Sequence, residues 1–242
     1  AAYQTVPKDR KAHSMHGYFI LGGDINIPID FHVDAIRDGR SFTTRRVVAY
    51  QEGKAIFNMS ASFHLDEEGA DHQITMPNVL TPEILLTDIQ QAKQLEEKDP
   101  ERFNRLMMAH PQVFEFRPVG KAIYLETENK PPFSHIWFRT KEKIKADIAL
   151  QHQLLAFASD YSLLLSATLP HRKEIEHQKI YYASLDHALW FHRDFEIDDW
   201  LLYAIESPSA SNARGYARGS VFDRSGKMVA SVAQEGLMRK FK

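Results

Sequence analysis

The chain has 242 residues and 43 % apolar content, enough for a substantial core in one large domain or two small ones. Its net charge of −2 and pI near 6.7 do not suggest nucleic acid as a partner. The absence of cysteine excludes disulfides, cysteine-ligated metal and a thiol nucleophile, and it is compatible with the cytoplasm, where we expect the protein to lie. No apolar run reaches about eighteen residues, so we expect no membrane partner.

The first part of the chain predicts antiparallel strands. Residues 13–19 form one strand, and residues 41–50 and 54–65 form two long strands. The short loop between the long strands ends in Gly53, which can take a positive φ. Apolar residues alternate along the second long strand, which predicts one inward face made by Ala55, Phe57, Met59, Ala61 and Phe63.

A charged connector follows. Thr81, Pro82 and Glu83 are typical of a helix start, with proline at the first helical position and an acid in the first turn. The helical pattern from residue 84 breaks at Asp99-Pro100 and resumes to residue 108, and its many charges favour a solvated connector over core. We therefore predict a first unit over residues 1–80, a helical linker over 81–113 and a second unit over 114–242.

The second unit repeats the first. Residues 144–159 predict a long, mostly buried helix. Residues 187–192 are similar to residues 13–19, and a later hairpin places Gly226-Lys227 where the first hairpin has Gly53-Lys54. Each unit is thus predicted to be a helix followed by several antiparallel strands.

The two copies differ at their front ends. The second copy has about forty-five residues from Phe114 to the end of its helix, whereas the first has only six before its turn, so by this comparison about forty residues are missing. We expect the first unit to lack a strand and most of a helix, and to leave apolar surface and a sheet edge uncovered unless a partner covers them.

One polar residue breaks the repeat. Gln234 stands where the first copy has Ala61, on the face that also carries Met228, Ala230 and Val232, so it is predicted to point inward. A buried amide without partners costs roughly 1–3 kcal/mol, so it needs specific hydrogen bonds. Gln234 is either a core residue satisfied by backbone or a group of an active site.

Three polar residues of the second unit could together hold a water molecule. Asp160 ends the predicted buried helix, Ser184 lies on the strand before residues 185–187, and Gln234 lies on the last strand. An ionised aspartate can accept a proton from water that a hydroxyl and an amide orient. Taken singly, Asp160 could be a polar helix end and Ser184 an ordinary strand serine.

Other site chemistries are less favoured. His13 and His16, like His187 and His192, have odd separations, which point the rings to opposite faces of a strand and away from one shared metal ion. A Ser-His-Asp triad with Asp186 and His187 fails for the same reason, and the sequence has no nucleophile elbow.

Small residues occupy positions 207–215 and would allow close approach of the backbone to a ligand. Arg214 or Arg218 could then meet a phosphate, which makes Arg214 a candidate substrate-binding residue. The alternative is a bulged strand entry with solvated arginines, and we favour it slightly for Arg218.

These segments together resemble the acyl-CoA thioesterase II family, and the match runs over nearly the whole chain. The matching stretches are residues 13–19, 37–42, 45–47, 59–63, 158–160, 185–187, 190–193, 200–203, 206–207, 213–215 and 234–236. The resemblance implies an α+β double hotdog fold, in which each of two units has a long helix wrapped by an antiparallel sheet.

The resemblance also implies a site. In that family an Asp, a Thr and a Gln of the second unit hold the thioester-cleaving water, and the motif positions put them at Asp160, Ser184 and Gln234. Serine replaces threonine here, which keeps the hydroxyl but loosens the rotamer.

The implied function is hydrolysis of acyl-CoA to free acid and coenzyme A, without cofactor or metal, in a homodimer or higher oligomer. The alternatives are a non-catalytic acyl-CoA-binding hotdog protein and a hotdog enoyl-CoA hydratase or dehydratase. The latter needs an Asp and a His in one site.

Overall fold

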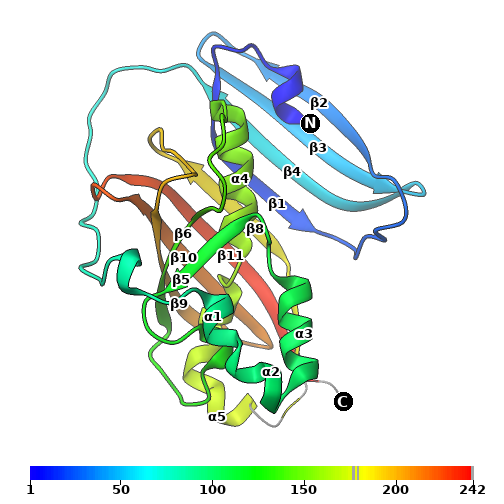
Figure 1. The fold of residues 1–242 in the computed structure, drawn as a ribbon. Coiled ribbons are helices and arrows are strands. Elements are labelled where there is room, and N and C mark those ends of the chain that lie inside the picture. The colour runs from blue at the N-terminus through cyan, green and yellow to red at the C-terminus, as the bar shows by residue number, and fades with distance from the viewer. Residues whose placement is uncertain (176–177, 179, 241–242) are drawn as a thin grey trace.

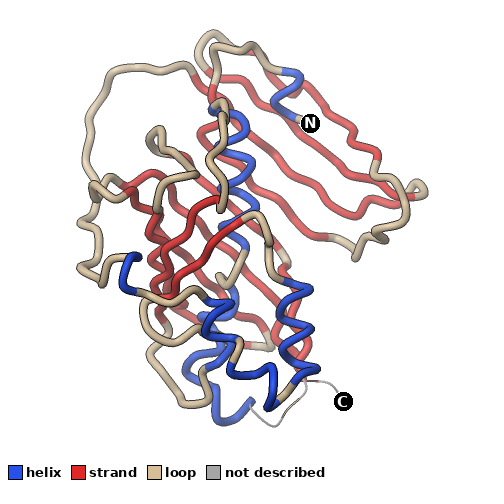
Figure 2. Tube along the Cα trace, viewed as in Figure 1, coloured by secondary structure: helices blue, strands red, loops and turns tan. Residues whose placement is uncertain are grey.

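The structure is a computed structural model that describes residues 1–175, 178 and 180–240. Its main feature is an 11-stranded sheet in the order β2-β3-β4-β1-β8-β11-β10-β9-β6-β5, with β7 pairing to β11 (Figures 1 and 2). All the strand pairs described are antiparallel. No helix in the described part of the chain is long and apolar enough to cross a membrane.

Three of the first four strands, β1, β3 and β4, agree with the sequence prediction, whereas β2 was not predicted. After a short 3₁₀ turn, η1 (Ala2–Thr5), come β1 (Lys11–Phe19), β2 (Asp30–Asp38), β3 (Phe42–Gln51) and β4 (Lys54–His64). The β3–β4 turn has positive φ at Glu52 (48°) and Gly53 (74°), as the glycine predicted. On β4, Ala61 and Phe63 are buried, which confirms the inward end of the predicted face.

The second part of the chain supplies the other strands and most helices. Its elements are β5 (Phe114–Pro118), η3 (Ile123–Leu125), β6 (Phe133–Thr140), α4 (Ile148–Asp160), η4 (Leu164–His171), α5 (Arg172–Ile175), β7 (Ile180–Ser184), β8 (Asp186–Phe191), β9 (Leu201–Ser211), β10 (Arg214–Asp223) and β11 (Met228–Lys240). The β10–β11 turn has Gly226 at φ 88°, in the role of Gly53. The equivalent strands β1 and β8 pair with each other, with Met15 opposite Leu189, and so join the two halves of the sheet.

The long helix is shorter at its start than predicted. It begins at Ile148 because the Asp147 side chain caps it, accepting a hydrogen bond from the Leu150 amide at 2.9 Å. Ile144 precedes the helix and still packs against the core. The helix contacts β1 and β8, where the two halves of the sheet meet (Figure 1).

The connector also differs from the prediction. Pro82 begins only a 3₁₀ turn, η2 (Pro82–Ile84), and the first α-helix, α1 (Asp88–Ala92), starts where Thr87 and Gln90 form a capping box. Then follow α2 (Gln94–Lys98) and α3 (Pro100–Ala109), so the predicted break at Asp99-Pro100 is confirmed. The connector is less solvated than predicted, since Asp88, Ala92 and His110 are buried.

The two halves have unequal cores. The larger core lies between the second-half sheet and α4 and includes Phe138, Leu155 and Tyr203. The first half has a small core around Val47 and Phe63. Strand β2 lies at the edge of the sheet and exposes apolar side chains, including Phe31 at 53 % and Ile36 at 57 %.

Candidate active site

The three residues predicted to hold water come from three different elements. Asp160 is the last residue of α4, Ser184 is the last residue of β7, and Gln234 lies in the middle of β11. Strand β7 pairs with β11 so that Ser184 lies opposite Gly236, two residues beyond Gln234. The sheet register and the end of the helix therefore bring residues from distant parts of the chain together.

The three side chains are hydrogen-bonded to one another. Gln234 Nε2 donates to Asp160 Oδ1 at 2.7 Å and also to the hydroxyl of Ser184. Ser184 Oγ donates to the same Asp160 oxygen at 3.3 Å. In the described part of the chain, both hydrogen bonds to this carboxylate use Oδ1.

The three groups differ in exposure. Gln234 is only 1 % exposed, as the strand alternation predicted, and it is satisfied by side chains rather than by backbone. Ser184 is partly buried, while Asp160 is exposed. The buried amide of Gln234 thus fixes the Asp160 carboxylate, which is accessible from solvent.

The turn after Asp160 is anchored in the connector. Tyr161 donates its hydroxyl to Asp88 Oδ2 at 2.9 Å, and its ring packs on Phe116 with 4.3 Å between centroids. Ser162 then takes a positive φ of 66°, which turns the chain away from the helix axis. These contacts hold the end of α4, and with it Asp160, in place.

Sequence reasoning missed His187 and Ser159 as members of this network. His187 Nδ1 lies 3.1 Å from Gln234 Oε1, and its Nε2 lies 2.9 Å from the hydroxyl of Ser159 on α4. Burial lowers the pKa of His187, and the nearby Asp160 carboxylate opposes this shift. The alternation along β8 could have indicated the inward position of His187, because His187 shares the inward face with Leu189.

Asp186 and His187 do not act together in a Ser-His-Asp triad, as the strand geometry predicted. Asp186 Oδ1 accepts from the backbone N–H of Glu235 at 2.6 Å, and the two nitrogens of His187 face Ser159 and Gln234 instead. Ser159 is fully buried, so it cannot meet a substrate. The described residues contain no group of three or more histidine or acidic side chains that could hold a metal ion.

Two glycines near Gln234 serve packing. A Cβ on Gly215 would lie 2.6 Å from Ala167 Cβ, and one on Gly236 would overlap the Leu164 side chain. Both obstacles belong to η4, which packs on β9, β10 and β11. The sequence predicted that small residues here leave room for a ligand. At Gly215, the space left by the missing side chain is instead filled by η4.

Arg214 is not brought together with the three polar residues. Its Nε donates to Glu235 Oε1 at 2.8 Å, and both side chains are 40 % exposed. Glu235 follows Gln234 on the strand and so points to the opposite face of the sheet. Arg218 lies on that face too, paired with Glu206 at 2.6 Å. The substrate-binding role of Arg214 stays a prediction.

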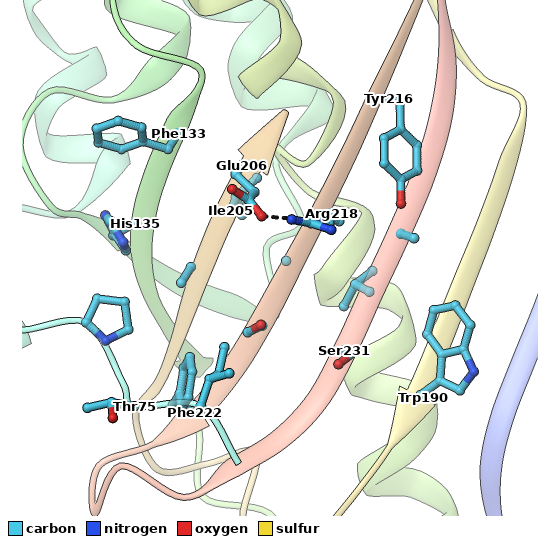
Figure 3. A pocket seen from close by; sticks show the side chains of 17 residues that line it. Thr75, Phe133, His135, Trp190, Ile205, Glu206, Tyr216, Arg218, Phe222 and Ser231 are labelled. Atoms are coloured by element: carbon cyan, nitrogen blue, oxygen red, sulfur yellow. Dashed lines mark hydrogen bonds and ion pairs between the residues drawn. The ribbon is translucent and has the colours of Figure 1, made fainter. Parts of the chain in front are cut away.

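A pocket of about 600 Å³ lies on this opposite face (Figure 3). Trp190, Tyr216 and the Arg218–Glu206 pair line it, together with residues of the segment between β4 and η2 such as Thr75. None of Asp160, Ser184 and Gln234 lines it. The network and this pocket are therefore separate features.

The comparisons with known proteins agree with the resemblance. Residues 124–237 match the family profile described as acyl-CoA thioesterase, and residues 1–64 match that of the acyl-CoA thioesterase N-terminal domain. Acyl-CoA thioesterase 2 of Haemophilus influenzae is 37 % identical over 239 residues, which cover 99 % of this chain and 83 % of that protein. Acyl-coenzyme A thioesterase 8 of Mus musculus is 36 % identical over 247 residues, covering 99 % and 76 %.

Solved structures give the same picture. The crystal structure of acyl-CoA thioesterase II TesB2 from Mycobacterium marinum has a TM-score of 0.82 and 38 % identity, covering 100 % of this chain and 85 % of that one. A protein described as having a hot dog fold, from Alicyclobacillus acidocaldarius, matches with a TM-score of 0.74 at 16 % identity, which shows the fold alone. The chain therefore belongs to the acyl-CoA thioesterase II family, with the α+β double hotdog fold that the sequence predicted.

Proposed function

We propose that this protein hydrolyses acyl-CoA thioesters with a water molecule held by Asp160, Ser184 and Gln234. The observation that carries the proposal is the exposed Asp160 carboxylate, fixed through one oxygen by the buried amide of Gln234 and the hydroxyl of Ser184. Membership of the acyl-CoA thioesterase family supports the substrate class.

The chemistry follows from these groups. Asp160 accepts a proton from the water as the water oxygen attacks the thioester carbonyl carbon. The C–S bond then breaks, coenzyme A leaves as a thiolate that takes the proton from Asp160, and the acyl group is released as a carboxylic acid. Gln234 and Ser184 orient the Asp160 carboxylate. Their donors hold it in one rotamer and so reduce the entropic cost of placing the water.

The structure favours hydrolysis over hydration or dehydration of the acyl chain. The latter needs an aspartate and a histidine that both reach the substrate. His187 is near Asp160, but it is only 4 % exposed and both of its ring nitrogens face protein groups. It therefore lies behind Gln234 and not beside the exposed carboxylate.

The test measures thiol release from acyl-CoAs of several chain lengths, using the wild type, Asp160→Asn and Asp147→Asn. The last variant is the matched control, since Asp147 caps the other end of the same helix and asparagine is an equally good cap. We expect Asp160→Asn to lower kcat by roughly 100-fold or more, as loss of a general base does, and Asp147→Asn to retain activity.

Two results would contradict the proposal. If Asp160→Asn keeps wild-type kcat, the carboxylate is not the base. If the folded wild type binds coenzyme A derivatives without releasing thiol from any of them, the protein is an acyl-CoA-binding hotdog protein. The oligomeric state, expected to be a homodimer or higher, is measured on the same samples by light scattering.

A further inference from the structure

A chain of hydrogen bonds continues from Gln234 into the core. Ser159 Oγ lies 2.9 Å from His187 Nε2, and His187 Nδ1 lies 3.1 Å from Gln234 Oε1. Ser159, His187 and Gln234 are 0 %, 4 % and 1 % exposed, so water does not compete for these bonds. This series of hydrogen bonds leads from the buried face of α4 to the Asp160 carboxylate.

The two N–H donors of Gln234 fix which group donates and which accepts in each of these hydrogen bonds. Its amide nitrogen has two hydrogens, and they point to the Asp160 carboxylate and the Ser184 hydroxyl. The amide oxygen therefore faces His187. If the amide turned by 180°, its oxygen would face the Asp160 carboxylate and the bond to that carboxylate would be lost. The orientation of this amide decides whether the carboxylate is held.

His187 holds the amide in the productive orientation. Because Gln234 Oε1 can only accept, His187 Nδ1 must carry a proton. In the neutral ring Nε2 is then an acceptor for the Ser159 hydroxyl at 2.9 Å, where it competes with the Ala156 carbonyl oxygen, 3.1 Å from the same hydroxyl. The alternative tautomer would place a lone pair of Nδ1 against a lone pair of the amide oxygen at 3.1 Å.

We propose that His187, oriented by Ser159, is a positioning residue that sets the Gln234 amide so that both of its N–H groups serve the water-holding site. His187 does not touch the substrate and acts only through Gln234. This inference rests on the proposed thioesterase function and adds a second layer to its site.

The first test compares His187→Leu with His187→Asn. Leucine fills a similar volume without a donor, whereas asparagine places an N–H group close to where imidazole Nδ1 lies. We expect His187→Leu to lower kcat by about 10- to 100-fold with little change in KM, because a buried amide oxygen loses its donor. We expect His187→Asn to recover most of this loss. Equal loss in both variants would overturn the proposal.

A matched control separates positioning from packing. His152 is also 4 % exposed and lies on α4, away from the network, stacked on Phe191 with 3.9 Å between centroids. His152→Leu makes the same substitution at an equally buried histidine. It should lower the melting temperature and leave kcat within about twofold, the usual scatter for independent sites.

A double-mutant cycle asks whether His187 acts through Gln234. If it does, His187→Leu has almost no further effect on kcat once Gln234→Ala is present, within about twofold. If His187→Leu lowers kcat by the same factor in both backgrounds, His187 acts independently and the proposal is wrong.

The tautomer can be measured without any activity. A long-range ¹H–¹⁵N correlation spectrum of ¹⁵N-histidine-labelled protein, with the His187 signals assigned by their loss in His187→Asn, shows which nitrogen carries the proton. A protonated Nδ1 supports the proposal, and a neutral ring protonated only at Nε2 overturns it. If the wild type releases no thiol from acyl-CoA, the proposed function fails while this spectrum still decides the orientation of the amide.

Discussion

The contact between Gln234 and Asp160 gives the sharpest prediction about the site. Gln234→Glu keeps the shape of the side chain but replaces the amide by a carboxyl group, 2.7 Å from Asp160 Oδ1. At that distance two unit charges repel by about 6 kcal/mol at an effective dielectric constant of about 20. This corresponds to about four pKa units. Solvent screens part of the repulsion at the exposed Asp160, but burial of the introduced group acts in the same direction.

The introduced carboxyl should therefore keep its proton at neutral pH. It can then donate one hydrogen bond to Asp160 and accept from His187, but the second N–H donor is lost. We expect kcat at pH 7 to fall by roughly 100-fold, the usual effect of removing one preorganised donor. As pH rises through the raised pKa the proton is lost and kcat should fall further, a decline that Gln234→Ala should not show.

Stability should follow the same titration. A group whose pKa is higher in the folded than in the unfolded state contributes stability fully below its unfolded value, about 4.3 for a glutamate side chain, and loses that contribution as pH rises through the folded pKa. The melting temperature of Gln234→Glu should thus fall increasingly below that of the wild type as pH rises. Steady-state kinetics and thermal unfolding from pH 4.5 to 9 test both effects. Wild-type kcat with the wild-type pH profile would refute the bond between the Gln234 amide and Asp160.

Three further predictions concern the hydroxyl, the packing and the acid stability of the fold. Ser184→Ala should lower kcat by about tenfold through loss of one hydrogen bond, and Ser184→Thr should keep the wild-type kcat; a Thr variant as slow as the Ala variant would show that the hydroxyl has no part. Gly236→Ala should lower the free energy of unfolding by about 1–3 kcal/mol in urea titrations, because the new Cβ overlaps Leu164, and an unchanged midpoint would contradict this packing. Burial lowers the pKa of His152 to about 4, with Tyr3 Oη 2.8 Å from its Nδ1. Since this pKa is lower than the unfolded value, the contribution of His152 to stability is present above pH 6.5 and is lost as pH falls toward 4. His152→Phe should therefore flatten the Tm–pH curve between these pH values. An equal slope in both proteins would assign the pH dependence to other groups.

Local patterns in the sequence predicted most of the strands and the inward position of Gln234. This worked because side chains alternate strictly along a strand, so a polar residue in an apolar alternation has a known direction. The same rule placed Asp186 and His187 on opposite faces and excluded a triad. Predictions failed where a local signal was overlooked, as at Thr87 and Asp147, whose side chains set the true starts of α1 and α4.

The sequence by itself determined the types of group available and the face on which each strand residue lies. It could not determine which groups meet, because Asp160, Ser184 and Gln234 come from the end of a helix and from two strands whose register depends on the packed sheet. For the same reason only the tertiary structure placed His187 beside Gln234 and paired Arg214 with Glu235. Direction along a strand is a local property of the backbone, whereas a hydrogen bond between distant residues depends on how the elements pack.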